Sequence, residues 1–310
     1  MANIRELSLE KERLGSGHRL CPGCGLSIIT RAVLRGTKDP VVVANATGCL
    51  EVSTTIYPFT SWNVPWIHNA FENAAATISG AESAYKALKR KGKIPKDKEI
   101  KFIAFGGDGG TYDIGLQSLS GALERGHNFV YVCLDNEGYM NTGIQRSSST
   151  PYGAWTNTSQ VGSVHKGKEQ FKKDLTAIVA GHHIPYVAQA SPHNYMDLVR
   201  KSQKAFSTKG PAFINVLSPC VPGWKYPPNM TIEMAKLAVE TCFWPLFEIE
   251  DDVWTLNYDP GENKKPIIEW LKPQKRFRHL LLPENKHIVD ALQANVDKRW
   301  EELKKRCKKE

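Results

Sequence analysis

The sequence lacks any apolar run long enough to cross a membrane. Its longest apolar runs, such as residues 129–134, fall far short of the roughly 18 residues that a transmembrane helix requires. The N-terminal stretch MANIRELSLEKERL carries too many charges for a signal peptide. We therefore expect a cytoplasmic protein with no membrane partner.

The sequence also lacks an acidic surplus and any motif that reads a nucleic-acid groove. There are 41 Lys and Arg residues against 32 Asp and Glu residues, which gives a formal net charge of +9. The basic residues concentrate at residues 86–101 and 298–309, where they alternate with Glu as on a solvated helix. We therefore expect no binding to nucleic acid, and the positive charge would instead favour an acidic protein partner.

Cysteine is too scarce for a disulfide scaffold. The 310 residues include 7 cysteines, an odd number, and disulfides are rare in cytoplasmic proteins. Metal ligation and core packing are therefore the roles that remain for these thiols. The composition, 41% hydrophobic and 24% charged, is that of an ordinary globular protein.

Strand-like and helical patterns alternate along the chain. Apolar β-rich runs predict strands at residues 41–46, 101–106, 129–134, 186–190 and 212–217. Helical spacing predicts helices at residues 69–91, 114–124, 170–180 and 195–206. This alternation predicts an α/β fold with a doubly wound, mainly parallel sheet, in which ligands bind at the carboxyl ends of the strands.

The chain changes character after Cys220. There the pattern predicts a helix at residues 231–241, a hairpin of strands 247–250 and 253–258, and a terminal surface helix. We therefore divide the chain into an α/β domain over residues 1–220 and a C-terminal extension over residues 221–310.

The predicted strand at residues 101–106 runs directly into a glycine-rich turn. This turn consists of Gly107, Asp108, Gly109 and Gly110 and leads into a helix expected to begin near Asp113. Glycines let the backbone approach an anion, and a helix N-terminus supplies unpaired N–H groups that suit phosphate. Asp108 adds a negative charge, so a divalent cation, preferably Mg²⁺, must lie between this carboxylate and a phosphate.

Asn136 follows the next predicted strand, after one intervening helix. Because neighbouring parallel strands end at the same edge, Asp108 and Asn136 can converge on one cation, with the Gly138 carbonyl as a third oxygen and two diphosphate oxygens beside it. Asn136 also opens a stretch, residues 136–168, that is rich in Gly, Ser, Thr, Asn and Pro and too long for a passive connection. We predict a functional loop there; the alternative for the glycine turn is a purely structural role.

Four cysteines lie in turns rich in Gly and Pro. They are Cys21 and Cys24 of CPGCG, Cys49 of ATGC and Cys220 of SPCVP. Four thiolates on such turns can hold a structural zinc ion or a 4Fe–4S cluster. The alternative is that Cys49 and Cys220 are unrelated buried thiols. The remaining cysteines are expected to be packing or surface residues: Cys133, Cys242 and Cys307.

Five segments resemble, in the same order, those of the β subunits of pyruvate:ferredoxin oxidoreductases. These thiamine-diphosphate enzymes are also called pyruvate synthases and belong to the 2-oxoacid:ferredoxin oxidoreductases. The segments are GHRLCPGCG, ATGCLEV, YPFTSWNVPWIHNAFENAAATISG, AFGGDGGTYDIG and LDNEGYMNTGIQRSSSTPYGAW. The resemblance covers nearly the whole chain and implies a thiamine-diphosphate-binding sheet of the diphosphate-domain type. It also implies oxidative decarboxylation of pyruvate to acyl-CoA and CO₂, or the reverse, with electrons passed through a 4Fe–4S cluster to ferredoxin.

The resemblance further implies roles for single residues. The cluster ligands would be Cys21, Cys24, Cys49 and Cys220, and the Mg²⁺ ligands Asp108, Asn136 and the Gly138 carbonyl. Asn141 would face the substrate as the catalytic residue. The residues that contact the cofactor would be Cys49, Gly107, Asp108, Gly109, Gly110, Asn136, Gly138, Tyr139 and Asn141. At one position, Leu26, some fused relatives carry an acidic residue instead.

Two parts of such an enzyme are missing from this sequence. They are a second, pyrimidine-binding thiamine domain with its activating glutamate and the clustered cysteines of a bacterial-type ferredoxin. We therefore expect partners: an α subunit, ferredoxin-like or γ subunits, and ferredoxin, together with the 2-oxoacid and coenzyme A. The loop at residues 136–168 and the segment with Trp62, Trp66 and His68 are candidates for the subunit interface, the alternative being ordinary core and loop.

Three other functions remain open from the sequence. One is the β subunit of an oxalate or branched-chain 2-oxoacid oxidoreductase. The more remote ones are a non-redox thiamine-dependent decarboxylase with a structural zinc ion and a basic binding module without catalysis.

Overall fold

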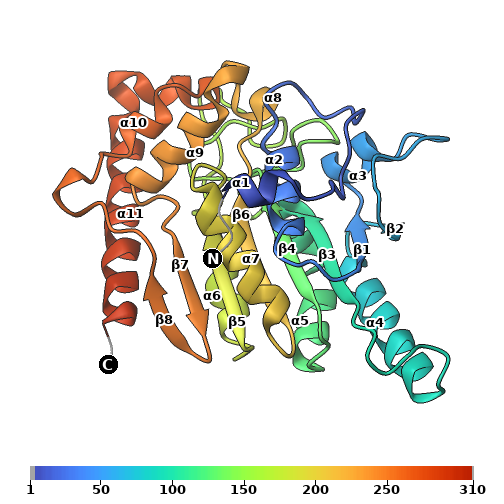
Figure 1. Ribbon diagram of the computed structural model, residues 1–310. Coiled ribbons are helices and arrows are strands. Elements are labelled where there is room, and N and C mark those ends of the chain that lie inside the picture. The colour runs from blue at the N-terminus through green and yellow to red at the C-terminus, as the bar shows by residue number, and fades with distance from the viewer. Residues whose placement is uncertain (1–3, 309–310) are drawn as a thin grey trace.

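One eight-stranded sheet runs through the computed structural model, which describes residues 4–308 (Figure 1). In spatial order its strands are β2 (Trp66–Asn69), β1 (Val41–Ala46), β3 (Lys101–Gly107), β4 (Val130–Asp135), β6 (Ala212–Leu217), β5 (Tyr186–Ala190), β7 (Phe247–Glu250) and β8 (Val253–Leu256). The first six run parallel, and β7 and β8 add an antiparallel edge. The predicted mainly parallel sheet is confirmed.

The apolar runs located the central strands well. Strands β1, β5 and β6 occupy the predicted residues, β3 ends one residue later than predicted, and β4 is shifted by one residue at both ends. Strand β2 was not predicted, because its four residues lie at the sheet edge, none of them fully buried, and form no apolar run. The helix predicted from residue 69 therefore begins later, at Ala74, because Asn69 belongs to β2.

Helices cover both faces of the sheet (Figure 1). The longer ones are α2 (Gly25–Leu34), α4 (Ala74–Arg90), α5 (Leu116–Glu124), α7 (Tyr195–Ser207), α9 (Thr231–Glu240) and α11 (Lys286–Cys307). The short ones are α1 (Ile4–Ser8), α3 (Cys49–Thr54), α6 (Leu175–Ala180), α8 (Val221–Trp224) and α10 (Ile268–Leu271). There are also a π-helix, η1 (Gly109–Ile114), and four 3₁₀ segments, η2 (Pro228–Met230), η3 (Gly261–Asn263), η4 (Lys275–Leu281) and η5 (Pro283–Asn285).

Alternate side chains of each central strand enter different cores. In β4, Val132 packs into the core with α2 and α7, whereas Tyr131 and Cys133 enter the core with α4, α5 and α11. Burial of one such side chain stabilises the fold by roughly 1.5–3 kcal/mol. This arrangement explains why the central strands are apolar on both faces.

Two predicted helices have different boundaries for local reasons. Helix α6 begins at Leu175 rather than at residue 170, because the Asp174 side chain accepts a hydrogen bond from the Ala177 N–H at 3.0 Å and caps the helix. The glycine-rich turn was expected to lead into a helix near Asp113. The chain is already helical from Gly109, where the π-helix η1 begins, and α5 follows it.

The C-terminal residues join the same sheet and core. Strand β7 pairs with β5, and the β7–β8 turn places Asp251 and Asp252 at positive φ, 47° and 66°, which suits a two-residue hairpin. The prediction of a terminal surface helix holds only for the outer face of α11. Its inner face is buried at intervals of three or four residues: Ile288, Leu292, Val296, Trp300 and Leu303. Among residues 4–308, no helix combines the length and the apolar character that a membrane span needs.

The strand order reverses between β1 and β3. From β1 the chain continues to β2 on one side, whereas β3 lies on the other side of β1. In open α/β sheets, the loops that leave such a pair of strands diverge and open a crevice at their carboxyl ends. The turns after β1 and β3, which contain Cys49 and Asp108, flank this crevice.

The stretch after β4 contains no regular helix or strand until α6, as its composition predicts. Much of it is nevertheless buried, including Ser147, Ser149, Thr150 and Lys168. Short bridges such as Tyr139 with Gln145 fold it back on itself. The loop is therefore packed against the carboxyl ends of the strands.

Gly36, just after α2, lies against the backbone of α7. A Cβ added there would lie 2.7 Å from the carbonyl carbon of Ser202, so Gly36→Ala should lower the free energy of unfolding by about 1–3 kcal/mol. Gly80→Ala, on the exposed side of α4 with open space around it, should leave stability equal or higher by roughly 0.5–1 kcal/mol. Chemical denaturation of both variants checks this. Equal stability of Gly36→Ala and the wild type would contradict the observed packing.

Candidate functional site

A pocket lies in the crevice where the strand order reverses. It is formed by the turns after β1, β3 and β4. Its lining residues are Thr47, Gly48, Cys49, Phe71, Gly107, Asp108, Gly109, Gly110, Asn136, Gly138, Tyr139, Met140, Asn141 and Thr142. The structure thus brings together the predicted glycine turn, Asn136, Asn141 and one of the four cysteines.

Asp108 is fully buried at the base of this pocket. Its carboxylate accepts a hydrogen bond from Ser147 Oγ at 2.5 Å and one from the Asn136 N–H at 3.3 Å. Burial raises the pKa of Asp108 well above its usual range, and the negative charge of Asp135 raises it further. A cation beside this carboxylate would offset both effects.

Asn136 places one terminal atom of its amide 2.9 Å from Asp108 Oδ1 and 2.8 Å from the Gly138 carbonyl oxygen. With the amide nitrogen at that point, Asn136 donates two hydrogen bonds. With the amide oxygen there, this oxygen would lie from each of the other two oxygens at close to the roughly 2.8–3.0 Å edge of an octahedron whose Mg–O distances are about 2.0–2.1 Å. Asp108, Asn136 and the Gly138 carbonyl therefore supply the oxygen ligands that suit Mg²⁺, with Asn136 at a fitting distance from the other two.

The glycine turn is closely covered on one side and open on the other. A Cβ on Gly109 would lie 2.4 Å from the Tyr139 ring, and one on Gly110 would lie 2.8 Å from the Phe71 carbonyl oxygen. Tyr139 Oη donates a hydrogen bond to the Gly109 carbonyl at 2.9 Å, and burial raises its pKa to about 12. A Cβ on Gly107, in contrast, would meet no atom within 4 Å. The backbone is thus accessible from the pocket, as an anion would require.

The four cysteines in Gly- and Pro-rich turns come together beside this pocket. Cys21 and Cys24 lie close enough to Cys49 to raise the pKa of its thiol. Cys49, Cys24 and Cys21 likewise raise the pKa of Cys220. Burial raises the pKa of Cys24 to about 11 and that of Cys49 to about 12, and it raises the pKa of Cys220 as well. These thiols would have to lose their protons to bind a metal.

The CPGC turn is held by the chain that follows Cys220. Gly23 has a φ of +74°, and a Cβ there would lie 2.3 Å from the Pro228 carbonyl oxygen. The Thr231 hydroxyl also donates a hydrogen bond to the Gly23 carbonyl. The 3₁₀ segment η2 and the start of α9 therefore fix the two N-terminal cysteines next to Cys220.

Cys49 connects the two parts of the site. Its thiol is hydrogen-bonded by the Asn141 side chain, and its pKa also responds to the charge of Asp108. Leu26 is buried beside it, next to Asn45 and Gly107. A thiol group and a candidate metal site thus share one wall.

The other cysteines lie outside this group. Cys133 and Cys242 are buried in the core, and Cys307 is half-buried at the end of α11. Cys242 lies in a left-handed turn just after α9, with a φ of 57°. In the described part of the chain, residues 4–308, no three His, Cys, Asp or Glu side chains are arranged around one ion, and this includes the four neighbouring cysteines as they are placed here. The oxygens around Asp108 include only one such side chain, so this finding does not bear on them.

The segment predicted as an interface divides into core and surface. Trp62 is only 5% exposed, and its indole N–H donates to Thr54 Oγ1 at 2.8 Å, so Trp62 belongs to the core. Trp66 stacks on Trp62, and His68 stacks on Trp66 with its Nε2 atom 3.2 Å from Thr47 Oγ1 at the pocket. The large apolar side chains exposed in this segment are instead Tyr57, Phe59 and Ile67.

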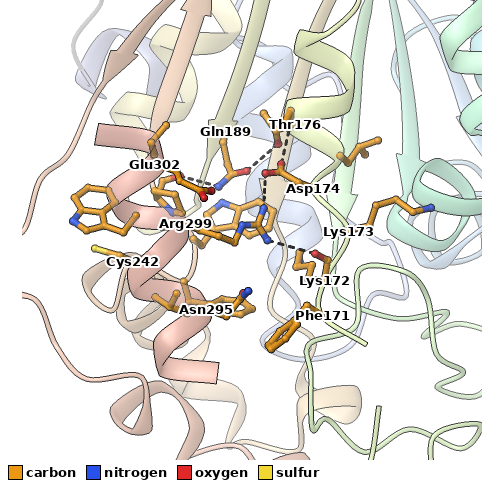
Figure 2. Close-up of a pocket in the computed structure, with 18 of the residues that line it drawn as sticks. Phe171, Lys172, Lys173, Asp174, Thr176, Gln189, Cys242, Asn295, Arg299 and Glu302 are labelled. Atoms are coloured by element: carbon orange, nitrogen blue, oxygen red, sulfur yellow. Dashed lines mark hydrogen bonds and ion pairs between the residues drawn. The ribbon is translucent and has the colours of Figure 1, made fainter. Parts of the chain in front are cut away.

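A larger cavity lies away from the glycine turn, between α11 and the end of the sheet that carries β5 and β7 (Figure 2). Several of its charged side chains make ion pairs. Arg299 pairs with Asp174 at 2.5 Å, and Lys173 lies 3.5 Å from Asp113. Lys172 reaches from this cavity toward the end of β4, where it contacts Asp135.

A family model described as "Thiamine pyrophosphate enzyme, C-terminal TPP binding domain" matches residues 46–216, more than half of the chain. The chain is 57% identical to the pyruvate synthase subunit PorB of Thermotoga maritima over 97% of this chain and 95% of that protein. It is 54% identical to the PorB subunit of Methanocaldococcus jannaschii, over 93% and 95% of the two chains. The ketoisovalerate oxidoreductase subunit VorB of Pyrococcus abyssi is 44% identical over 97% and 96%.

A solved structure shares the fold. The 2-oxoglutarate:ferredoxin oxidoreductase of Magnetococcus marinus superimposes with a TM-score of 0.56 at 19% identity, covering 73% of this chain and 79% of that one. The expected diphosphate-domain type of sheet is thereby confirmed.

Lys168 makes stability depend on pH. It is 2% exposed, its ammonium donates to the Ser148 and Thr150 carbonyls, and burial lowers its pKa to about 7. The unfolded chain, with a pKa near 10.5 at this group, binds a proton between about pH 7 and 10.5 that the native chain has released. Stability should therefore rise with pH across that window, and the contribution is absent below it.

The wild-type melting temperature should rise between pH 7 and pH 10 by an amount on the order of a few degrees. Lys168→Met should remove this rise. Calorimetry across this range measures the effect. The exposed Lys209→Met variant is the control and should follow the wild-type profile. A Lys168→Met profile parallel to that of the wild type would show that the ammonium is not the source.

Proposed function

This chain belongs to the family of pyruvate synthase PorB subunits, the β subunits of thiamine-diphosphate-dependent 2-oxoacid:ferredoxin oxidoreductases, and from this premise we propose how its own residues serve that reaction. The reaction that we assign is the oxidative decarboxylation of pyruvate to acyl-CoA and CO₂, or its reverse. As a subunit, the chain works within a multi-subunit complex.

One observation carries the proposal. The turns after three neighbouring strands meet in a single pocket, and they supply an oxygen set, an open glycine backbone and a thiol. An oxygen set with a glycine turn suits Mg²⁺ and a diphosphate. A thiol in the wall of the same pocket can be a ligand of an electron-accepting cluster close to the reacting carbon.

Asp108, Asn136 and the Gly138 carbonyl would hold Mg²⁺. The backbone at Gly107, Gly109 and Gly110 would face the diphosphate, with Tyr139 supporting the turn through its hydrogen bond to Gly109. Thiamine diphosphate supplies the electron sink that makes loss of CO₂ from a 2-oxoacid possible. Asn141, exposed at the pocket mouth and hydrogen-bonded to the Cys49 thiol, would face the substrate.

Cys21, Cys24, Cys49 and Cys220 would hold a 4Fe–4S cluster. The backbone N–H groups of Leu26 and Gly223 hydrogen-bond to the thiols of Cys24 and Cys220, contacts that lower the pKa of each against the effect of burial. Such N–H···S hydrogen bonds also tune the potential of a cluster. A cluster accepts single electrons, which a structural zinc ion cannot do, so the redox reaction favours the cluster.

We propose α and ferredoxin-like or γ subunits as the partners, with ferredoxin as the electron acceptor and coenzyme A as the acyl acceptor. The α subunit would contribute the pyrimidine-binding domain and its glutamate. The formal net charge of +9 favours an acidic ferredoxin, and this attraction should weaken as salt is raised.

A branched-chain 2-oxoacid is the second candidate substrate. The specific observation in its favour is the 44% identity to a ketoisovalerate oxidoreductase subunit over nearly the whole chain. The higher identity to PorB subunits favours pyruvate. Oxalate is a third alternative, which neither of these relatives favours.

The function is tested in the complex assembled with its partner chains under anaerobic conditions. It should reduce a viologen dye with pyruvate and coenzyme A faster than with 3-methyl-2-oxobutanoate. Asp108→Ala should abolish this turnover, because the diphosphate would face only neutral oxygens. The affinity for thiamine diphosphate with Mg²⁺ should fall by more than roughly 10–100-fold, which is the loss typical of replacing a residue that only hydrogen-bonds to a metal ligand.

Asn136→Ala should weaken binding less, because it removes a neutral ligand. Asp290→Ala, on α11, removes a carboxylate of the exposed Lys286–Asp290 pair and should bind like the wild type. Calorimetric titration with thiamine diphosphate and Mg²⁺ measures all three variants. Wild-type affinity in Asp108→Ala would falsify the metal site.

Replacement of any of the four clustered cysteines by Ser should remove iron from the protein. Cys220→Ser is the most informative change, because this residue is furthest from the others in sequence. Cys133→Ser, Cys242→Ser and Cys307→Ser should retain iron, since these thiols lie in the core or at the end of α11. Iron and sulfide analysis of anaerobically purified variants separates the two groups, and a full cluster in Cys220→Ser would contradict this ligand set.

A further inference from the structure

Two buried carboxylates flank Asn136 in the sequence. Asp135 and Glu137 are both 0% exposed, and both contact the ammonium of Lys172, at 2.9 and 3.1 Å. Asp135 also accepts hydrogen bonds from the Tyr112 hydroxyl at 2.6 Å and the Ser149 hydroxyl at 2.5 Å. A single cation thus holds the residues on either side of the proposed Mg²⁺ ligand.

A second buried cation comes from far along the chain. Arg276, in η4, is 2% exposed and pairs with Glu137 Oε2 at 2.5 Å. Its guanidinium lies 4.3 Å from the centre of the Trp224 ring, and the Trp224 indole N–H donates to the Asn136 carbonyl at 2.8 Å. Arg276 and Trp224 therefore hold the backbone of Asn136 and the side chain of Glu137 together.

The backbone at Glu137 needs this support. Glu137 has a φ of +68°, a left-handed conformation that a residue other than glycine rarely adopts. This turn precedes Gly138, whose carbonyl oxygen lies 2.8 Å from the Asn136 amide atom that is itself 2.9 Å from Asp108 Oδ1. Ion pairs that fix the Glu137 side chain therefore also fix the direction of the next carbonyl.

Helix α11 contacts the backbone at Lys172 and the side chain of Asp174. Arg299 donates to the Lys172 carbonyl at 3.4 Å and pairs with Asp174 at 2.5 Å, and Figure 2 shows these side chains at the wall of the large cavity. Burial lowers the pKa of Lys172, but Asp135 and Glu137 outweigh this effect and raise it, so the ammonium stays charged. Arg276 and Arg299 both lie beyond residue 220, so the C-terminal residues reach the centre of the site.

We infer that Lys172 and Arg276 are positioning residues that fix Asn136 and the Gly138 carbonyl in the arrangement that binds Mg²⁺, an inference that rests on the proposed function. Neither cation lines the cofactor pocket itself. Lys172 acts through Asp135 and Glu137, the direct neighbours of the ligand, and Arg276 acts through Glu137. Buried ion pairs contribute little to stability compared with well-packed apolar groups, so such a network is better explained by the geometry that it imposes.

The test uses the assembled complex, freed of its divalent metal by chelation, with Mn²⁺ as the probe and thiamine diphosphate present. The double variant Glu137→Gln with Arg276→Met removes both charges, so that no unpaired ion stays buried. Electron paramagnetic resonance of free Mn²⁺ should show an affinity about 10–100-fold weaker than that of the wild type. The iron content should remain unchanged.

A matched control removes a buried ion pair elsewhere. Asp197 and Lys201 of α7 form such a pair at 2.8 Å, with side chains 7% and 2% exposed, and neither lines the cofactor pocket. Asp197→Asn with Lys201→Met should shift thermal stability without changing Mn²⁺ affinity by more than about twofold, since the change lies outside the shell around the metal. An equal loss of Mn²⁺ affinity in both double variants would overturn the inference.

A milder variant covers the case in which the double variant does not fold. Arg276→Lys keeps the buried charge but loses the planar guanidinium that stacks on Trp224, so its Mn²⁺ affinity should be intermediate. Wild-type affinity in Arg276→Lys and in a folded double variant would overturn the positioning role. Failure of the wild-type complex to bind Mn²⁺ with thiamine diphosphate would instead overturn the proposed function, and the inference with it.

Discussion

The burial of one carboxylate, Asp108, is the constraint on which the rest of the site depends. A carboxylate fully removed from water is unfavourable unless hydrogen bonds and cations surround it. Ser147 and Asn136 supply the hydrogen bonds. Three buried carboxyl groups, those of Asp108, Asp135 and Glu137, lie near two buried cations, Lys172 and Arg276. A divalent cation together with a diphosphate is a natural partner for such a site.

Much of this arrangement follows from sequence pattern because it depends on local rules. Apolar runs locate the buried parallel strands, and strands of one sheet that run parallel end at one edge. The structure accordingly brings Asp108, Asn136 and the Gly138 carbonyl together, as predicted. Strand β2 escaped prediction because an exposed edge strand of four residues has no such run. The buried face of α11 was missed because its apolar residues stand among many charges.

The supporting residues could not be predicted, because their contacts depend on the complete tertiary fold. Ser147 is 39 residues from Asp108, Lys172 is 35 residues from Glu137, and Arg276 is 139 residues from Glu137. No spacing rule connects such positions, and Lys or Arg among many basic residues gives no signal of its own. The run of Ser and Thr at residues 147–150 was the one available hint, since so many hydroxyls in an irregular segment need buried acceptors.

The distance in sequence between Glu137 and Arg276 matters while the protein is being synthesised. A ribosome makes the chain from its N-terminus, so Glu137 is synthesised 139 residues before Arg276, the second cation that pairs with it. Until Arg276 emerges, the turn after β4 must keep an acid in water or bury it with Lys172 alone. A chain cut short before η4 could form most of the sheet, but it would leave a carboxylate without its second partner. The centre of the protein is therefore completed late in synthesis, by residues that lie far beyond the sheet's own parallel strands.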